Sequence, residues 1–195
     1  MTTIGDQSFQ KTLADRRLRI SDLEFVGILA FIDDYAALWA CAHPTVQDAM
    51  DLVLCTGQRP ADVLKFNVTD IADGNLRLTQ NKTGKKLHIA IEGELADVID
   101  RILAKPRDKV NKALLQNPDR QRLNYFALRF RFDKAREVAG VDFQFRDWRA
   151  KAATDTEDLG HAQKLLGHKN RSSTEIYTRD RKGDIVSPLS RNRQR

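Results

Sequence analysis

The sequence predicts a mainly α-helical protein that contains one small three-stranded antiparallel sheet, an α+β arrangement. Apolar residues recur at helical spacing over most of the chain, and they alternate with polar residues only over residues 76–91. Gly and Pro residues separate the helical segments from one another. With 195 residues and a hydrophobic content of 41%, the chain can bury one core, so we expect a single domain.

The first part of the chain is predicted to form three helices. A Ser-x-x-Glu capping box opens the first helix, which covers residues 21–41. Thr45 is expected to cap the second helix, and Gly57 is placed to end it. Pro60 suits the first turn of a third helix that continues through Phe66, because proline lacks the amide hydrogen that a first turn leaves unused.

The alternating segment predicts the sheet. Its strands are expected within residues 68–72, 76–80 and 87–91, where apolar residues take every second position. An Asp-Gly turn at residues 73–74 joins the first two strands, and an Asn-Lys-Thr-Gly turn at residues 81–84 joins the last two. The three strands therefore form consecutive hairpins.

The remaining chain is predicted to return to helices. One helix covers residues 94–104, and the polar stretch 105–122 is expected to be an exposed loop. Asn124 caps the next helix, which runs up to Gly140. Residues 147–179 are expected to form three short helices.

Composition narrows the class of protein. Thirty-three Lys and Arg residues outnumber 27 Asp and Glu residues, and the net charge of +6 suits a polyanionic partner such as nucleic acid. The two cysteines, Cys41 and Cys55, have no clustered histidines beside them, so neither a disulfide framework nor a metal site is indicated. The chain has no signal-like N-terminus and no apolar run near the roughly 18 residues of a membrane span, so we expect a soluble cytoplasmic protein.

Five side chains suited to phosphate chemistry stand out. Each lies in a short motif: Thr-Gly-Gln-Arg-Pro, an Asn-Lys-Thr-Gly turn, Arg-Asp-Trp-Arg, Leu-Leu-Gly-His, and a tyrosine nine residues after that histidine. The side chains are, in chain order, Arg59, Lys82, Arg149, His168 and Tyr177.

In these motifs the chain resembles the tyrosine recombinase family, in particular the catalytic domain of phage-type integrases, over about residues 20–180. That family carries an Arg, a hairpin Lys, a His-x-x-Arg, a Leu-Gly-His and a nucleophilic Tyr in this order. The resemblance implies the tyrosine recombinase catalytic-domain fold. It also implies a site-specific recombinase that cleaves and rejoins DNA, for integration or excision of a mobile element, without a metal or nucleotide cofactor.

The resemblance assigns a role to each of the five residues. Arg59 and Arg149 bind the non-bridging oxygens of the pentacovalent phosphate, a task that suits bidentate guanidinium donors. His168 adds a further hydrogen bond to this phosphate. Lys82 protonates the departing 5′-oxygen, and Tyr177 attacks phosphorus to give a 3′-phosphotyrosyl intermediate.

One residue departs from the family pattern. Arg146 stands where the family has the histidine of its His-x-x-Arg motif, and an arginine cannot act as a general base at physiological pH. Arg146 could still contact the phosphate and lower the pKa of Tyr177. Alternatively, the register is shifted and Arg146 is the catalytic arginine, although the residues after Arg149 match the family's continuation better.

The resemblance also implies partners and domain boundaries. Residues 21–180 correspond to the catalytic domain, residues 1–20 to a tail or linker remnant, and residues 181–195 to a basic C-terminal tail. Residues 1–20 are too short for the family's N-terminal core-binding domain, which we expect to be absent. The expected partner is double-stranded DNA, which the protein would bind as a homotetramer on paired sites. Accessory DNA-bending proteins are possible further partners, and no membrane association is expected. Two alternatives stay open: a catalytically degenerate DNA-binding module and a type IB topoisomerase-like relaxing enzyme.

Overall fold

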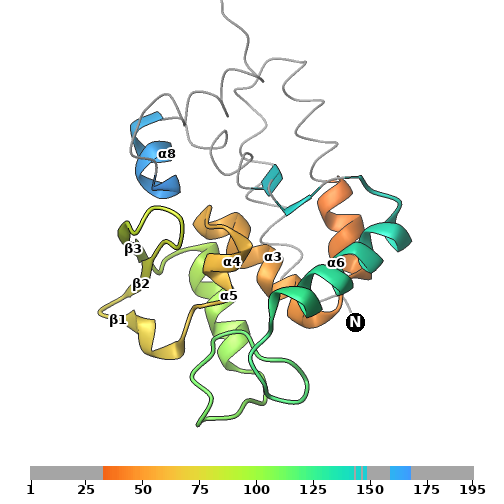
Figure 1. Ribbon diagram of the computed structural model, residues 1–195, viewed down its shortest axis with the longest axis horizontal. Coiled ribbons are helices and arrows are strands. Elements are labelled where there is room, and N and C mark those ends of the chain that lie inside the picture. The colour runs from red at the N-terminus through yellow and green to blue at the C-terminus, as the bar shows by residue number, and fades with distance from the viewer. Residues whose placement is uncertain (1–32, 143, 146, 149–158, 168–195) are drawn as a thin grey trace, which may run out of the picture.

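The computed structural model describes residues 33–142, 144, 145, 147, 148 and 159–167. Helices make up most of this part, and one three-stranded antiparallel sheet lies at its edge (Figure 1). The predicted fold class is therefore confirmed. No helix among the described residues is long and apolar enough to cross a membrane.

Helix α3, Pro44–Thr56, runs through the middle of the molecule and buries Val46, Ala49, Met50 and Val53. A helix whose described part covers residues 33–41 precedes it. The predicted cap at Thr45 is wrong: Pro44 opens the helix, and the His43 ring caps it by accepting the Thr45 amide hydrogen over 3.2 Å. Proline favours the first helical position, so the residue before it becomes the cap.

The predicted end of α3 at Gly57 is confirmed. Gly57 has a φ of 63°, in the left-handed region that glycine adopts without a steric penalty. Helix α4, Pro60–Val63, starts three residues later and is shorter than predicted, because the chain turns at Leu64 and Lys65 before Phe66.

The first predicted strand is also shorter than expected. Residues 68–70 form the 3₁₀ turn η2, Val68–Asp70, and β1 covers only Ile71–Ala72. The cause is local: the Asp70 carboxylate accepts the Asn67 amide hydrogen over 2.8 Å, which closes a capping box around the turn.

The other two strands form the predicted hairpin. Strand β2, Asn75–Thr79, lies between β1 and β3, Lys86–Ala90, and both pairings are antiparallel. Leu76 is fully buried on the inner face, whereas Arg77 pairs with His88 and Thr79 with Lys86 on the outer face. The sheet therefore has one face in the core and one polar face.

Helix α5, Glu94–Leu103, agrees with the predicted helix and packs on α3 through Leu95, Val98, Ile99 and Ile102. The following stretch is not the exposed loop that was expected. Leu114 and Leu115 are buried in its centre, and the Leu114 amide donates to the Phe66 carbonyl over 2.8 Å. An irregular segment can enter the core here because its backbone amides and carbonyls form hydrogen bonds with other backbone groups.

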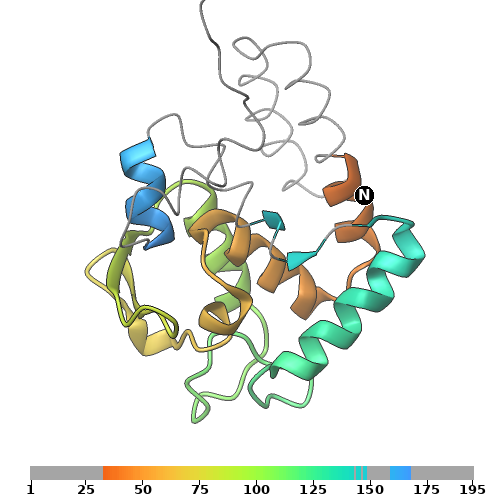
Figure 2. The same ribbon diagram turned by 45° about the horizontal axis from the view of Figure 1, so that its top comes forward.

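Helix α6, Tyr125–Ala139, has the predicted cap at Asn124 and the predicted end at Gly140. Its inner side joins an aromatic cluster that consists of Tyr35, Phe132, Phe145 and Trp148. Of the predicted C-terminal helices in residues 147–179, the described part consists of the helical residues 147 and 148 and helix α8, Leu159–Leu166. Helix α8 lies beside the β2–β3 hairpin in both views, on the opposite side of the molecule from α6 (Figures 1 and 2).

Candidate active site

Two of the predicted site residues, Arg59 and Lys82, lie in the described part of the structure. Arg146, Arg149, His168 and Tyr177 lie outside the described residues. The site can therefore be built from the segments that carry Arg59 and Lys82 and from α8, which ends just before the Leu-Gly-His histidine.

Arg59 is held between two backbone constraints. It is the N-cap residue of α4, with Gly57 in the left-handed region before it and Pro60 after it. Its side chain is 28% exposed, and its Nη1 lies 3.9 Å from Oδ2 of Asp62. Both of these buried atoms have no hydrogen-bond partner within the described part of the chain. The guanidinium is thus oriented by a charge without being saturated by it.

Asp62 was not predicted as a site residue, yet it joins two parts of the site. The residue is 3% exposed, and its Oδ1 accepts the Asn81 amide hydrogen over 2.8 Å. One carboxylate therefore faces Arg59 and also holds the turn that carries Lys82. The sequence did place Asp62 three residues after Arg59, about one helical turn away. This position alone does not indicate a site residue, because acidic residues in the first turn of a helix usually interact with the helix dipole.

Lys82 is exposed at the tip of the β2–β3 hairpin. Backbone hydrogen bonds hold the base of the turn. The backbone amide of Gln80 donates to the Lys85 carbonyl, and the backbone amide of Gly84 donates to the Gln80 carbonyl, each over 2.9 Å. The Thr83 hydroxyl also donates to Oε1 of Gln80 over 2.7 Å. A braced turn with an exposed lysine can present its ammonium group to a ligand outside the protein.

Two buried glutamines connect the hairpin, the Arg59 loop and α8, and we call them the glutamine relay. Gln80 donates from Nε2 to Oε1 of Gln58 over 2.7 Å and to the Leu166 carbonyl over 2.9 Å. Gln58 donates from Nε2 to the carbonyls of Leu165 and Thr56, over 2.7 and 2.9 Å. Three segments that are far apart in the sequence therefore meet at these two amides.

Gly167 allows this close approach. It follows α8 with a φ of 66°, and a Cβ atom at this position would overlap the side-chain amide of Gln80. The residue after it is His168, so the relay contacts the backbone immediately before the predicted site histidine.

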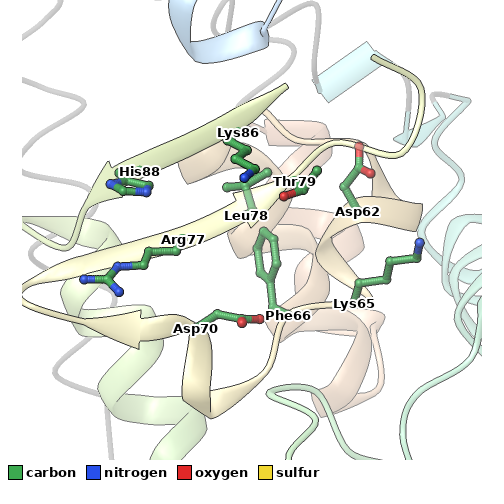
Figure 3. Close-up of a pocket in the computed structure, with 9 residues that line it drawn as sticks. All are labelled: Asp62, Lys65, Phe66, Asp70, Arg77, Leu78, Thr79, Lys86 and His88. Atoms are coloured by element: carbon green, nitrogen blue, oxygen red, sulfur yellow. The ribbon is translucent and has the colours of Figure 1, made fainter. Parts of the chain in front are cut away.

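A shallow pocket of about 250 Å³ opens on the outer face of the sheet, and its lining includes four basic side chains and the two acidic side chains of Asp62 and Asp70 (Figure 3). Arg77, His88 and Lys86 come from the two strands, and Lys65 comes from the turn after α4. Arg77 forms an ion pair with Asp73, whereas Lys65 donates to the neutral side chain of Asn81. Lys65 therefore contacts an uncharged side chain of the hairpin that carries Lys82.

Neither cysteine contributes to this region. Both are free thiols, and burial raises the pKa of Cys55 to about 12, so its reactive thiolate form is suppressed. In the described ranges, no group of three or more His, Cys, Asp or Glu side chains is placed to hold a metal ion.

Comparison with known proteins identifies relatives of this chain. The profile of the phage integrase family matches residues 18–183. The integrase of Enterobacteria phage P21 is 30% identical over 188 residues, which cover 87% of this chain and 48% of that protein. The chain thus spans about half the length of the curated integrases that it matches.

Solved structures share the fold. The lambda integrase catalytic core superposes with a TM-score of 0.61 at 25% identity, covering 70% of this chain and 93% of that one. A lambda integrase tetramer bound to a Holliday junction gives a TM-score of 0.67 at 24% identity, covering 81% of this chain and 49% of that one. The predicted resemblance is confirmed, and the chain belongs to the phage integrase family of tyrosine recombinases.

Proposed function

We propose that this chain is the catalytic part of a site-specific DNA recombinase that cleaves and rejoins DNA through a covalent bond to Tyr177, in the service of integrating or excising a mobile element. The observation that carries the proposal is the meeting of three distant segments. The Arg59 loop, the Lys82 hairpin and the end of α8 before His168 are joined by Asp62 and by the glutamine relay.

Arg59 would bind the scissile phosphate. Asp62 orients the Arg59 guanidinium from one side while part of the arginine side chain reaches solvent. A phosphate oxygen is the acceptor that such a group prefers, and the interaction strengthens as negative charge accumulates in the transition state. By the family resemblance, Arg149 and His168 contribute the other donors. Arg146, which departs from the family pattern, would add a positive charge near the phosphate.

In the reaction, the phenolic oxygen of Tyr177 forms a bond to phosphorus while the bond from phosphorus to the 5′-oxygen breaks. Lys82 delivers a proton to that departing oxygen, so the 5′-hydroxyl leaves in its neutral form. Its exposed place on the hairpin supports contact with DNA outside the protein. The Tyr177 proton is released to a base or to solvent, which the surrounding cations favour by lowering the pKa of the phenol. Rejoining is the reverse of these steps.

Double-stranded DNA is the proposed partner, and the net charge of +6 favours it. We propose a tetramer on paired sites, by analogy with the lambda integrase tetramer, in which the segment after Tyr177 docks onto a neighbouring subunit. Residues 21–180 would form the catalytic domain in this assembly.

The test uses the purified chain and a pool of nicked duplexes whose central 30 or so base pairs are randomised, so that no target site needs to be known. Covalent protein–DNA adducts are isolated under denaturing conditions and sequenced. We expect adducts with the parent chain and none with Tyr177→Phe, which loses only the nucleophilic oxygen and should bind DNA about as well as the parent.

Each alternative has its own result in this test. DNA binding without any adduct would favour a catalytically degenerate binding module, for which the substitution at Arg146 is the specific argument. Relaxation of supercoiled plasmid without strand exchange between two duplexes would favour a topoisomerase-like enzyme. An adduct that persists in Tyr177→Phe would remove Tyr177 from its role.

A further inference from the structure

We infer that Gln58 and Gln80 are positioning residues: their buried amides set the distances between Arg59, Lys82 and the end of α8, and so determine the rate of strand cleavage without touching DNA. The inference rests on the proposed function, because it concerns the same site. The family resemblance assigned no role to either glutamine, although Gln58 lies in the Thr-Gly-Gln-Arg-Pro motif beside Arg59.

The relay leaves no amide group unused. Gln58 uses both Nε2 hydrogens, for Thr56 and Leu165, and its Oε1 accepts from Gln80. Gln80 uses both Nε2 hydrogens, for Gln58 and Leu166, and its Oε1 accepts from Thr83. Both side chains are almost fully buried, at 0% and 1% exposure. A shift of any one segment would leave a buried polar group without a hydrogen-bond partner, which costs free energy of folding. The relay therefore favours one arrangement of the three segments.

Each glutamine acts on a different predicted group. Gln80 follows β2 directly, lies two residues before Lys82 and accepts a hydrogen bond from the Thr83 hydroxyl, so it stabilises the conformation of the hairpin turn. Gln58 precedes Arg59 in the loop between α3 and α4, so it governs the approach to the guanidinium. Loss of Gln80 should mainly disturb the proton donor, and loss of Gln58 should mainly disturb the contact of Arg59 with the phosphate in the transition state.

The third contact is with the C-terminus of α8. The carbonyls of Leu165 and Leu166 belong to the last turn of the helix, where intrahelical partners run out. The two glutamines supply hydrogens to these carbonyls, and Gly167 fits against Gln80 because it has no Cβ. The relay therefore fixes the point from which the chain continues to His168.

The experiment compares Gln58→Met and Gln80→Met. Methionine keeps the length and approximate volume of the side chain but removes all of its relay hydrogen bonds. The matched control is Leu76→Met, a volume-conserving change at a fully buried position on β2 that leaves the relay intact. Single-turnover cleavage is measured on a duplex recovered from the randomised pool, made once with the natural 5′-oxygen and once with a 5′-thiol leaving group that needs no proton.

With the 5′-oxygen substrate, we expect both glutamine variants to cleave about tenfold to a hundredfold more slowly than the parent, the scale that follows from displacing a catalytic group by about 1 Å. DNA affinity should stay within about twofold, because no DNA contact is removed. With the 5′-thiol substrate, Gln80→Met should recover most of the parent rate and Gln58→Met should not. Leu76→Met should behave as the parent on both substrates.

Cleavage by both glutamine variants within about twofold of the parent would overturn the inference. Equal recovery of both on the 5′-thiol substrate, or of neither, would also overturn it, because simple loosening of the core does not distinguish the two leaving groups. If Gln80→Met does not fold, Gln80→Glu replaces it: its buried carboxyl can donate a hydrogen only when protonated, so its cleavage relative to the parent should rise as pH falls. A ratio that does not change with pH would contradict the relay.

The parent reaction separates the two proposals. A parent chain that forms no adduct contradicts the proposed function, and with it the inference, before any variant is considered. A parent chain that forms the adduct while the variants show no difference contradicts the relay alone.

Discussion

Arg101 and Arg59 both face buried aspartates, but their hydrogen bonds differ. Arg101 lies on α5 and donates from Nε and Nη2 to Asp48 over 3.3 and 3.2 Å, and from Nη2 to Asp51 over 2.5 Å. Arg59 approaches Asp62 only to 3.9 Å, and neither atom of that pair has a hydrogen-bond partner in the described part of the chain. The first arginine forms hydrogen-bonded ion pairs with two aspartates, and the second is oriented by one aspartate without a hydrogen bond to it.

The surroundings of the two arginines extend this difference. Lys105 adds a second cation to Asp48, so the cluster between α3 and α5 balances two acids with two bases. Burial alone would lower the pKa of Arg101, but Asp51 and Asp48 outweigh it and raise that pKa. Hydrogen-bonded ion pairs of this kind fix two helices against each other. A guanidinium that makes no hydrogen bond to the aspartate it faces is instead suited to a ligand that brings its own oxygens.

The same ion-pair cluster also shows why Tyr35 is unsuited to be a nucleophile. Burial raises the pKa of Tyr35 well above its usual value, and Asp51, which accepts its hydroxyl hydrogen, raises it further. The phenolate is therefore strongly disfavoured at neutral pH. Tyrosine chemistry needs cations rather than carboxylates nearby, which is the environment proposed for Tyr177.

The largest expected effects come from substituting the two arginines themselves. Arg59→Ala should lower single-turnover cleavage by at least about a hundredfold, the scale for one lost transition-state donor, while the unfolding midpoint in urea stays close to the parent's. Arg101→Ala should do the opposite. It leaves Asp48 and Asp51 with less compensation, and because its side chain is 39% exposed we expect a loss of about 1–3 kcal/mol of stability.

Both variants are assayed by urea unfolding and by cleavage per folded molecule. Near-normal cleavage by Arg59→Ala would remove this residue from the site. A large loss of cleavage by folded Arg101→Ala would show that the two arginines do not divide into a structural and a functional one.

An intermediate effect is expected at Asp62. Asp62→Asn keeps an oxygen that can accept the Asn81 amide hydrogen but removes the charge that faces Arg59. We expect cleavage to fall about tenfold with a change in stability below about 1 kcal/mol, because the hairpin contact survives and the guanidinium is less well oriented. Asp62→Ala is the matched comparison: it loses both contacts, and it should be slower and less stable. Equal rates for Asp62→Asn and the parent would show that the 3.9 Å pair is incidental.

Sequence reasoning recovered the features that local rules determine. Asn124 and Gly140 bound α6 as predicted, because caps act within one helical turn. The β2–β3 hairpin followed from alternation, and the structure has Arg59 between two helices and Lys82 in a hairpin turn, where the local sequence patterns placed them. The 3₁₀ turn at residues 68–70 was missed because the apolar pattern there predicted a strand. The hydrogen bond from the Asn67 amide to the Asp70 carboxylate favours the turn instead.

The missed parts of the site depend on long-range contacts. The hydrogen bond between Gln80 and Gln58 spans 22 residues, and the bonds from Gln58 to Leu165 and from Gln80 to Leu166 span 107 and 86. A lone glutamine at the end of a strand is usually solvated, so nothing in its neighbourhood indicates that it is buried. Such a pair becomes visible only when the tertiary structure brings its partners together.

The smallest expected effect extends the comparison to lysines. Lys105 forms an ion pair with Asp48, whereas Lys65 and Lys86 border the pocket on the outer sheet face (Figure 3), and Lys65 donates to the neutral amide of Asn81. If these two lysines contact DNA phosphates, each substitution to Gln should reduce the slope of log affinity against log salt by about 1, because one fewer counterion is released. Cleavage at saturating DNA should not change. Lys134→Gln on α6, across the molecule from the sheet, is the control and should leave the slope as it is. A slope that is unaffected by Lys65→Gln and Lys86→Gln would place the DNA away from this face, and the positive charge of the sheet would then serve only solubility.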